Sequence, residues 1–219
     1  MALLTSAINM ESGCDSISLT DRRNIVSEML DRLDQVAVMR HPLGFIHFDV
    51  GSMGEGISVP LRFHVWTGMS LAWSDPLGKS HDHVWNLTSL VVAGALTDSA
   101  LVFEEAAQGN ERIVEIVYSE DGNQAESNGQ RVVSREISKQ LVEAGSVYRV
   151  SANAFHRTDI VELPTATLVI ARPGSPAARP RIIASLDEGA TARAAPRSPI
   201  AVEDARSALQ QVLDCLHEE

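Results

Sequence analysis

The stretch 78-GKSHDHVWNLTSLVVAGAL-96 places two histidines, His81 and His83, at the start of an apolar run rich in β-branched residues. Such a run predicts a buried strand. Side chains two positions apart on a strand share a face, so the two imidazole rings are expected to point the same way. Two interpretations follow: a polar pair on a solvated face, or two ligands of one metal ion, since imidazole is the commonest biological metal ligand.

The chain on either side of this stretch also predicts strands. The segments are short, β-branched and bounded by turn residues, as in an all-β sandwich or barrel. The clearest are 44-GFIHFDVG-51, 58-SVPLRFHVW-66, 99-SALVFEEA-106, 112-RIVEIVYS-119, 130-QRVVSREIS-138 and 165-TATLVIARP-173. Two amphipathic helices are expected outside the strands, over residues 21–39 and 202–216.

Charge and cysteine content argue against several classes of partner and site. The formal net charge is −11, whereas nucleic acids and anionic membranes bind clustered Lys and Arg. Cys14 and Cys215 form neither a CxxC pair nor a cluster with His, so we expect no disulfide framework and no thiolate metal site. A reducing, cytoplasmic setting is therefore expected, and no signal peptide or transmembrane segment is predicted.

A later stretch, 143-EAGSVYRVSANAFHRTDIV-161, supplies a third histidine, His156. Its spacing resembles the second motif of the cupin superfamily: Gly, five residues, Pro, one residue, Gly, two residues, His. Gly145 and His156 keep that register, with Ser151 at the Pro position and Asn153 at the second Gly position. Asn is the next best residue after Gly for a left-handed turn, so this replacement is mild.

The segment from His81 to Gly94 is similar to the first cupin motif, with Leu87 at the Glu position. That motif reads HxH, three or four residues, Glu, six residues, Gly. The resemblance covers roughly residues 60–173. It implies a mainly β fold, a double-stranded β-helix barrel that holds one divalent metal ion. His81 and His83 would come from one strand and His156 from a facing strand. Because leucine cannot ligate a metal, the implied site is neutral; Fe(II) is favoured, with Zn(II), Ni(II) and Mn(II) as alternatives.

Three-His sites of this kind resemble those of thiol dioxygenases and diketone-cleaving dioxygenases. The stretch 64-HVWTGMSLAWSDPLGKSHDHVW-85 is similar to part of the bacterial cysteine dioxygenase-like proteins. That family also carries a Ser-x-His-x-Tyr set, where this chain has Thr167, Val169 and Ala171. The scaffold and the metal ligands are thus expected to be shared, and the substrate chemistry is not.

Further candidates for catalysis lie on the strand LRFHVW. Alternation places Arg62, His64 and Trp66 on one face of this strand. If that face lines the barrel, Arg62 can hold a substrate carboxylate and His64 can act as an acid, a base or a fourth ligand. Alternatively, Arg62 is solvated and Phe63 faces the core.

The remaining candidates flank the three histidines. Tyr148 is preferred to Arg149 as an inward-facing hydrogen-bond donor. The predicted catalytic residues are Arg62, His64 and Tyr148. The predicted substrate pocket consists of Trp66, Trp85, Leu87 and Thr158. His41, His47 and His217 are treated as ordinary surface or core residues.

The predicted organisation is a flexible arm over residues 1–17, a cupin domain with an N-terminal helix over 18–185, and a linker with a C-terminal helix over 186–219. The expected function is that of a mononuclear non-haem Fe(II) dioxygenase or oxygenase of a small carboxylate- or amine-bearing substrate, in bacterial secondary metabolism. A Zn, Ni or Mn lyase, isomerase or bond-forming enzyme, and a non-catalytic small-molecule-binding cupin, are the alternatives. The expected partners are the substrate, O2 and a second copy of the chain in a homodimer.

Overall fold

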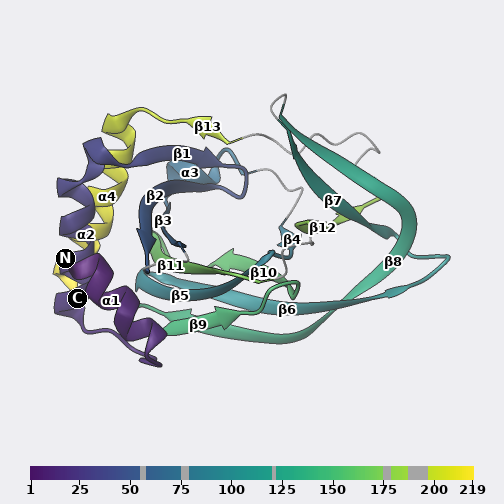
Figure 1. Cartoon of the computed structure of the whole chain (residues 1–219), viewed down its shortest axis with the longest axis horizontal. Coiled ribbons are helices and arrows are strands. Elements are labelled where there is room, and N and C mark those ends of the chain that lie inside the picture. Colours follow the sequence, from purple (N-terminus) through teal and green to yellow (C-terminus); the bar gives the residue numbers. More distant parts are fainter. Residues whose placement is uncertain (55–57, 75–78, 120–121, 175–178, 187–196) are drawn as a thin grey trace.

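The structure is a computed structural model that describes residues 1–54, 58–74, 79–119, 122–174, 179–186 and 197–219 (Figure 1). Strands dominate it and helices flank them, which confirms the predicted mainly β fold class with an N-terminal and a C-terminal helix. The helices are α1 (Ala2–Glu11), α2 (Leu19–Asp31), the 3-10 turn η1 (Leu33–Gln35), α3 (Gly68–Leu71) and α4 (Val202–Glu218). The strands are β1 (Ala37–His41), β2 (Phe45–Met53), β3 (Val59–Trp66), β4 (Ser80–His81), β5 (Trp85–Ala93), β6 (Ala95–Glu105), β7 (Glu111–Ser119), β8 (Gly122–Glu143), β9 (Val147–Val150), β10 (Phe155–Ile160), β11 (Thr165–Pro173), β12 (Arg181–Ser185) and β13 (Ser198–Pro199).

The strands form two antiparallel sheets. One has seven strands in the order β13-β1-β2-β3-β11-β5-β9, and the other closes on itself in the order β10-β4-β12-β7-β8-β6. Figure 1 shows the first sheet curving beside the helices and the long strands β6 and β8 running away from it. The strands that carry the two histidine motifs lie in both sheets, so the space between the sheets is where the motifs meet.

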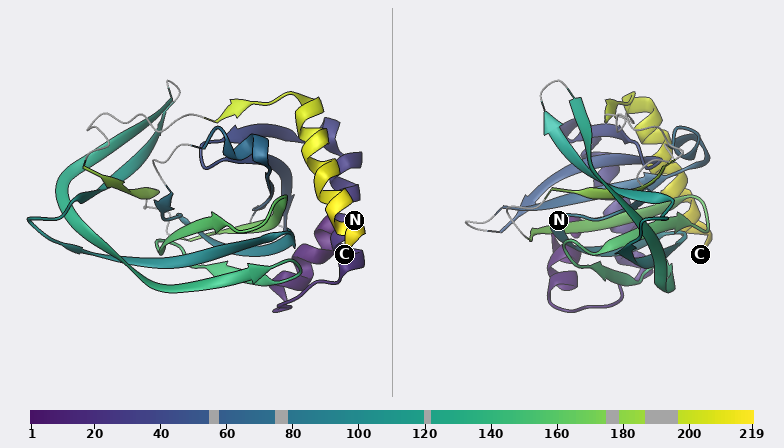
Figure 2. Two further views of the ribbon diagram at one scale, coloured as in Figure 1. Left: turned by 180° about the vertical axis from the view of Figure 1, so that it is seen from behind. Right: turned by 90° about the vertical axis from the view of Figure 1, so that its right-hand side faces the viewer.

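The main hydrophobic core lies outside the space between the sheets. Helices α1, α2 and α4 lie together against one face of the seven-stranded sheet (Figure 2). That face is apolar because alternate residues of β2 and β3, such as Phe48 and Phe63, point toward the helices. The intervening residues of the same strands therefore point toward the other sheet, and these include His47, Arg62 and His64.

The first residues differ from the predicted flexible arm. Residues Ala2–Glu11 form helix α1, in which Leu3, Ala7 and Met10 are buried against the core. Their spacing places them on one helical face, and the carboxylate of Glu28 accepts hydrogen bonds from the amino group of Met1 and the backbone N–H of Leu3. The prediction of a loose arm is wrong for this segment, because its three buried apolar residues lie among small, polar and exposed apolar ones.

One of the two predicted helices is shorter than predicted, and the other is confirmed. The helix predicted over residues 21–39 is only Leu19–Asp31, and the chain after it turns into β1 at Ala37. The helix predicted over 202–216 is confirmed as Val202–Glu218. Residues 187–196 of the predicted linker lie outside the described residues, while Ser198–Pro199 pair with β1 as β13.

Among the described residues, no helix has both the length and the apolar character that crossing a bilayer requires.

Candidate metal centre

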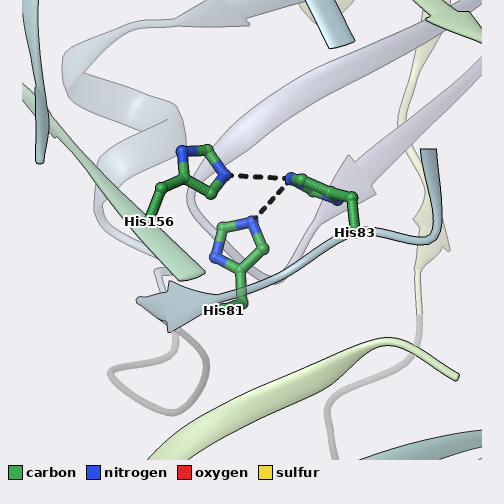
Figure 3. A group of neighbouring side chains, drawn as sticks. All are labelled: His81, His83 and His156. Atoms are coloured by element: carbon green, nitrogen blue, oxygen red, sulfur yellow. Dashed lines mark hydrogen bonds between the residues drawn. The ribbon is translucent and has the colours of Figure 1, made fainter. Parts of the chain in front are cut away.

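His81, His83 and His156 come together at one point between the sheets (Figure 3). His156 on β10 lies directly opposite His81 on β4 in an antiparallel pair. Nε2 of His83 lies 3.1 Å from Nε2 of His81 and 3.0 Å from Nε2 of His156. Ligand atoms from all three side chains lie within 4.8 Å of one another, so the group can hold a metal ion.

The chain reaches this arrangement differently from the prediction. The predicted continuous strand through His81, His83 and Trp85 is wrong: β4 ends at His81, and β5 begins at Trp85 in the other sheet. His83 lies in the connection between them. Its carbonyl accepts a hydrogen bond from the backbone N–H of Asn153 at 2.7 Å. Asn153 has a φ of 63°, the left-handed turn that its place in the motif requires.

The connection also has a buried ionic anchor. Asp82 is buried, and its carboxylate accepts hydrogen bonds from the backbone N–H of Arg181 at 2.6 Å and from Nε of the same residue at 2.7 Å. A charge-assisted pair of this kind fixes geometry better than a neutral contact. Asp82 therefore holds the two histidines on either side of it against β12.

Hydrogen bonds behind the rings determine which nitrogens are available to a metal. Nδ1 of His156 lies 2.8 Å from the carboxylate of Asp98, and Nδ1 of His81 lies 3.2 Å from the carbonyl oxygen of Lys79. Both partners are acceptors, so in the neutral form of each ring Nδ1 carries the proton and Nε2 presents a lone pair. Nε2 of His83 carries one proton at most, so it can donate a hydrogen bond to only one of the other two Nε2 atoms. At least one lone pair at the centre is therefore left without a donor, and a bound cation would accept it.

The spacing also fits a metal. Nitrogens on neighbouring octahedral positions of an ion with bonds of about 2.1 Å are separated by about 3.0 Å, which matches the two Nε2 separations above. Burial, followed by the neighbouring imidazoles of His81 and His156, lowers the pKa of His83 well below its usual value, so the ring is neutral. Neutral imidazole is the form that binds metals.

We expect Asp98→Asn to lower metal affinity by about 10- to 100-fold, the usual cost of losing an outer carboxylate that orients a ligating histidine. The amide keeps the shape of Asp98 but removes the charge that fixes the proton on Nδ1 of His156. Chelator competition with Zn(II) measures the change. Asp159→Asn is the control, since Asp159 lies on the same strand as His156 but pairs with Arg157. Equal affinity in both variants would contradict the role of Asp98.

The three histidines open onto a cavity of about 720 Å³ between the two sheets. Every residue predicted for the site lines it: Arg62, His64, Trp66, His81, His83, Trp85, Leu87, Tyr148, His156 and Thr158. The volume lies in the range of small-molecule sites. The structure thus brings together residues from β3, β4, β5, β9 and β10.

Strand β3 settles the two alternatives left open for LRFHVW. Arg62 and His64 line the cavity, while Phe63 is fully buried on the helix side of the sheet. Both faces of the strand are therefore used, because the main core lies outside the barrel. The guanidinium of Arg62 lies 5.6 Å from the ring centroid of Trp85, within cation–π range.

Tyr148 faces the cavity, and its neighbour Arg149 is exposed and pairs with Asp15. Burial and the charge of Asp98 raise the pKa of Tyr148, whereas hydrogen bonds with Ser89 and Thr158 oppose the increase. The phenol therefore remains protonated at neutral pH and can donate a hydrogen bond.

His41 and His47, treated as ordinary residues from the sequence, also line the cavity. Of the seven histidines in the chain, only His217 lies elsewhere among those described. Burial, with smaller contributions from Arg197 and Arg62, lowers the pKa of His47 to about 3. The signal that could have found His47 is its alternation with Ile46 and Phe48 in a strand whose other face is apolar.

No protein-family model and no curated protein matches the sequence. Among solved structures, the chain is similar to one reported for DMSP lyases, with 16% identity and a TM-score of 0.34 over 63% of this chain and 52% of that chain. A hydroquinone 1,2-dioxygenase from Sphingomonas sp. TTNP3 matches with 12% identity and a TM-score of 0.31 over 56% and 64%. An oxalate oxidase matches with 16% identity and a TM-score of 0.32 over 81% and 71%. The chain spans less than two thirds of the first two, and at such low similarity the matches carry no information on its activity.

Proposed function

We propose that the protein is a metal-dependent enzyme of the cupin superfamily, a mononuclear non-haem Fe(II) oxygenase of a small carboxylate-bearing substrate. The observation that supports it most is the convergence of three imidazoles, with no carboxylate in the group, on a cavity of about 720 Å³. His81, His83 and His156 would hold the metal. An ion bound by three neutral ligands keeps its full charge and open positions, which supplies binding places for an anion and for O2.

The charges around the cavity favour an acid over an amine as substrate. The chain has a formal net charge of −11, yet the described lining contains four cationic side chains, of Arg62, Lys79, Arg181 and Arg197, and only two carboxylates, of Asp82 and Asp159. Both carboxylates are already paired with arginines. A cavity of this sign attracts anions and repels amines.

Individual residues then have distinct roles in the proposed reaction. Arg62 would pair with the substrate carboxylate, since guanidinium matches its two oxygens. The Tyr148 phenol would donate a hydrogen bond to a substrate oxygen, oriented by Thr158. His64 would donate a hydrogen bond to the substrate as a neutral imidazole, because burial holds its pKa well below the usual value. Trp66, Trp85 and Leu87 would exclude water from the reacting centre.

The test is O2 consumption by protein reconstituted anaerobically with Fe(II), given a panel of small carboxylic acids. Fe(II)-loaded wild type is expected to consume O2 with at least one acid. Zn(II)-loaded wild type and Fe(II)-treated His156→Ala are expected to consume none. Turnover of an acid by the Zn(II) form without O2 would overturn the oxygenase proposal and favour a lyase or isomerase.

We also propose a cytoplasmic location and a homodimeric state for the protein. The described cysteines, Cys14 and Cys215, are free thiols, which suits the reducing cytoplasm proposed for the protein. A homodimer is the proposed oligomeric state and is checked by light scattering.

A further inference from the structure

A second group of polar side chains lines the cavity on the seven-stranded sheet. His47 on β2 lies directly opposite His64 on β3, and His64 lies directly opposite Thr167 on β11. These three residues form one row across three neighbouring strands, here called the histidine row. All three line the cavity. The row is separate from the three histidines of the candidate metal centre, which come from β4, β10 and the connection after β4.

The histidine row contains polar atoms that have no partner within the protein. Nδ1 of His47 and Oγ1 of Thr167 are buried and make no hydrogen bond. The exposed fractions of the two residues are 3% and 1%. Buried polar groups in folded proteins are nearly always hydrogen-bonded, so unpartnered ones that line a cavity indicate a ligand or an ordered water.

The surroundings of the row favour an anion over a second metal ion. The row contains two imidazoles and a hydroxyl but no carboxylate, and the ring centroids of His47 and His64 lie 5.2 Å apart. The charges of Arg197 and Arg62 also lower the pKa of His47, which means that the potential at its ring is positive. A positive potential repels a cation and stabilises an anion.

Aromatic side chains adjoin the row. The ring centroid of Phe45 lies 4.3 Å from that of His64 and 4.9 Å from that of Trp66. Both Phe45 and Trp66 line the cavity. A ligand that places an anionic group on the row therefore meets an apolar wall beside it, which suits a flat or apolar body attached to the acid.

We propose that the histidine row, with Arg62 beside it, binds the carboxylate of a small organic acid whose apolar body packs on Phe45 and Trp66. Arg62 lies two residues from His64 on the same strand face and supplies the charge, while His47, His64 and Thr167 supply directed hydrogen bonds. That this acid is the substrate rests on the proposed function. Binding of the acid does not, because His81, His83 and His156 are not among these groups.

The test uses sodium benzoate as the probe and chelator-treated, metal-free protein, with binding measured by calorimetry. Benzoate is expected to bind wild type, and both His47→Gln and Thr167→Val are expected to weaken binding by about 10-fold, since a hydrogen bond to a charged group is lost. In wild type, benzoate should shift the imidazole nitrogen resonances of His47 and His64 and leave those of His217 in place.

Thr97→Val and His217→Gln are the matched controls. Thr97 also has a buried hydroxyl without a partner, but it does not line the cavity. Both controls should bind benzoate as wild type does. Equal affinity in wild type, His47→Gln and Thr167→Val, or no benzoate binding at millimolar concentration, would overturn the inference. Because no metal is present, either result leaves the oxygenase test to be decided separately.

Discussion

Alanine at His81, His83 or His156 is expected to lower metal affinity by more than about 100-fold, a larger loss than the one expected for Asp98→Asn. Each substitution removes one of three nitrogens whose lone pairs converge, and the described group holds no fourth side chain that could replace it. The remaining two imidazoles would bind as an ordinary weak pair. Competition with a coloured chelator, using Zn(II) and Fe(II) in turn, measures the loss.

His217→Ala is the control for these variants, because His217 is the histidine that does not line the cavity among those described. It should bind metal as wild type does. Unfolding curves should show that the three alanine variants remain folded, since their rings contribute to a polar cavity and not to the main core. Wild-type affinity in any one of the three variants would remove that residue from the proposed metal centre.

Phe63→Ala is expected to lower the free energy of unfolding by about 3 to 5 kcal/mol, the usual cost of emptying a buried phenylalanine site. Phe63 has an exposed fraction of 0% and packs edge-to-face on Phe48, with ring centroids 6.1 Å apart. It lies in the layer that joins helices and sheet, so its loss weakens the contact that determines which face of β3 lines the cavity. Urea unfolding followed by circular dichroism measures the change.

Val133→Ala provides the comparison, since Val133 is 41% exposed on β8. Its effect should stay within about 0.5 kcal/mol. If Phe63→Ala also changed the free energy of unfolding by less than about 1 kcal/mol, the layer between helices and sheet would not be the main core. The assignment of Arg62 and His64 to the cavity would then lose its physical basis.

The sequence predicted the β class and the three histidines because their signals are local. The alternation of β-branched residues and the motif spacing need no knowledge of distant parts of the chain. Asn153 is an example: its place in the motif predicted a left-handed turn, and its φ is 63°. The C-terminal helix was found for the same reason, through the spacing of Val202, Ala205, Leu209, Val212 and Leu216, of which all but the exposed Val202 are buried.

Other features depended on contacts that no local pattern contains. The chain leaves one sheet at His81 and enters the other at Trp85, although residues 80–93 read as one strand. His47 seemed ordinary because only the packing of α1, α2 and α4 on the opposite face shows that its own face lines a cavity. From the sequence, either Arg62 or Phe63 was expected to face a single interior. The fold has two interiors: Phe63 lies in the apolar layer beneath the helices, and Arg62 lines the polar cavity.

The most direct test of the central claim is anomalous diffraction at the iron absorption edge, from crystals of protein reconstituted anaerobically with Fe(II). One anomalous peak per chain is expected, within bonding distance of Nε2 of His81, His83 and His156. Absence of a peak at that point, or a peak at another place in the chain, would contradict the account.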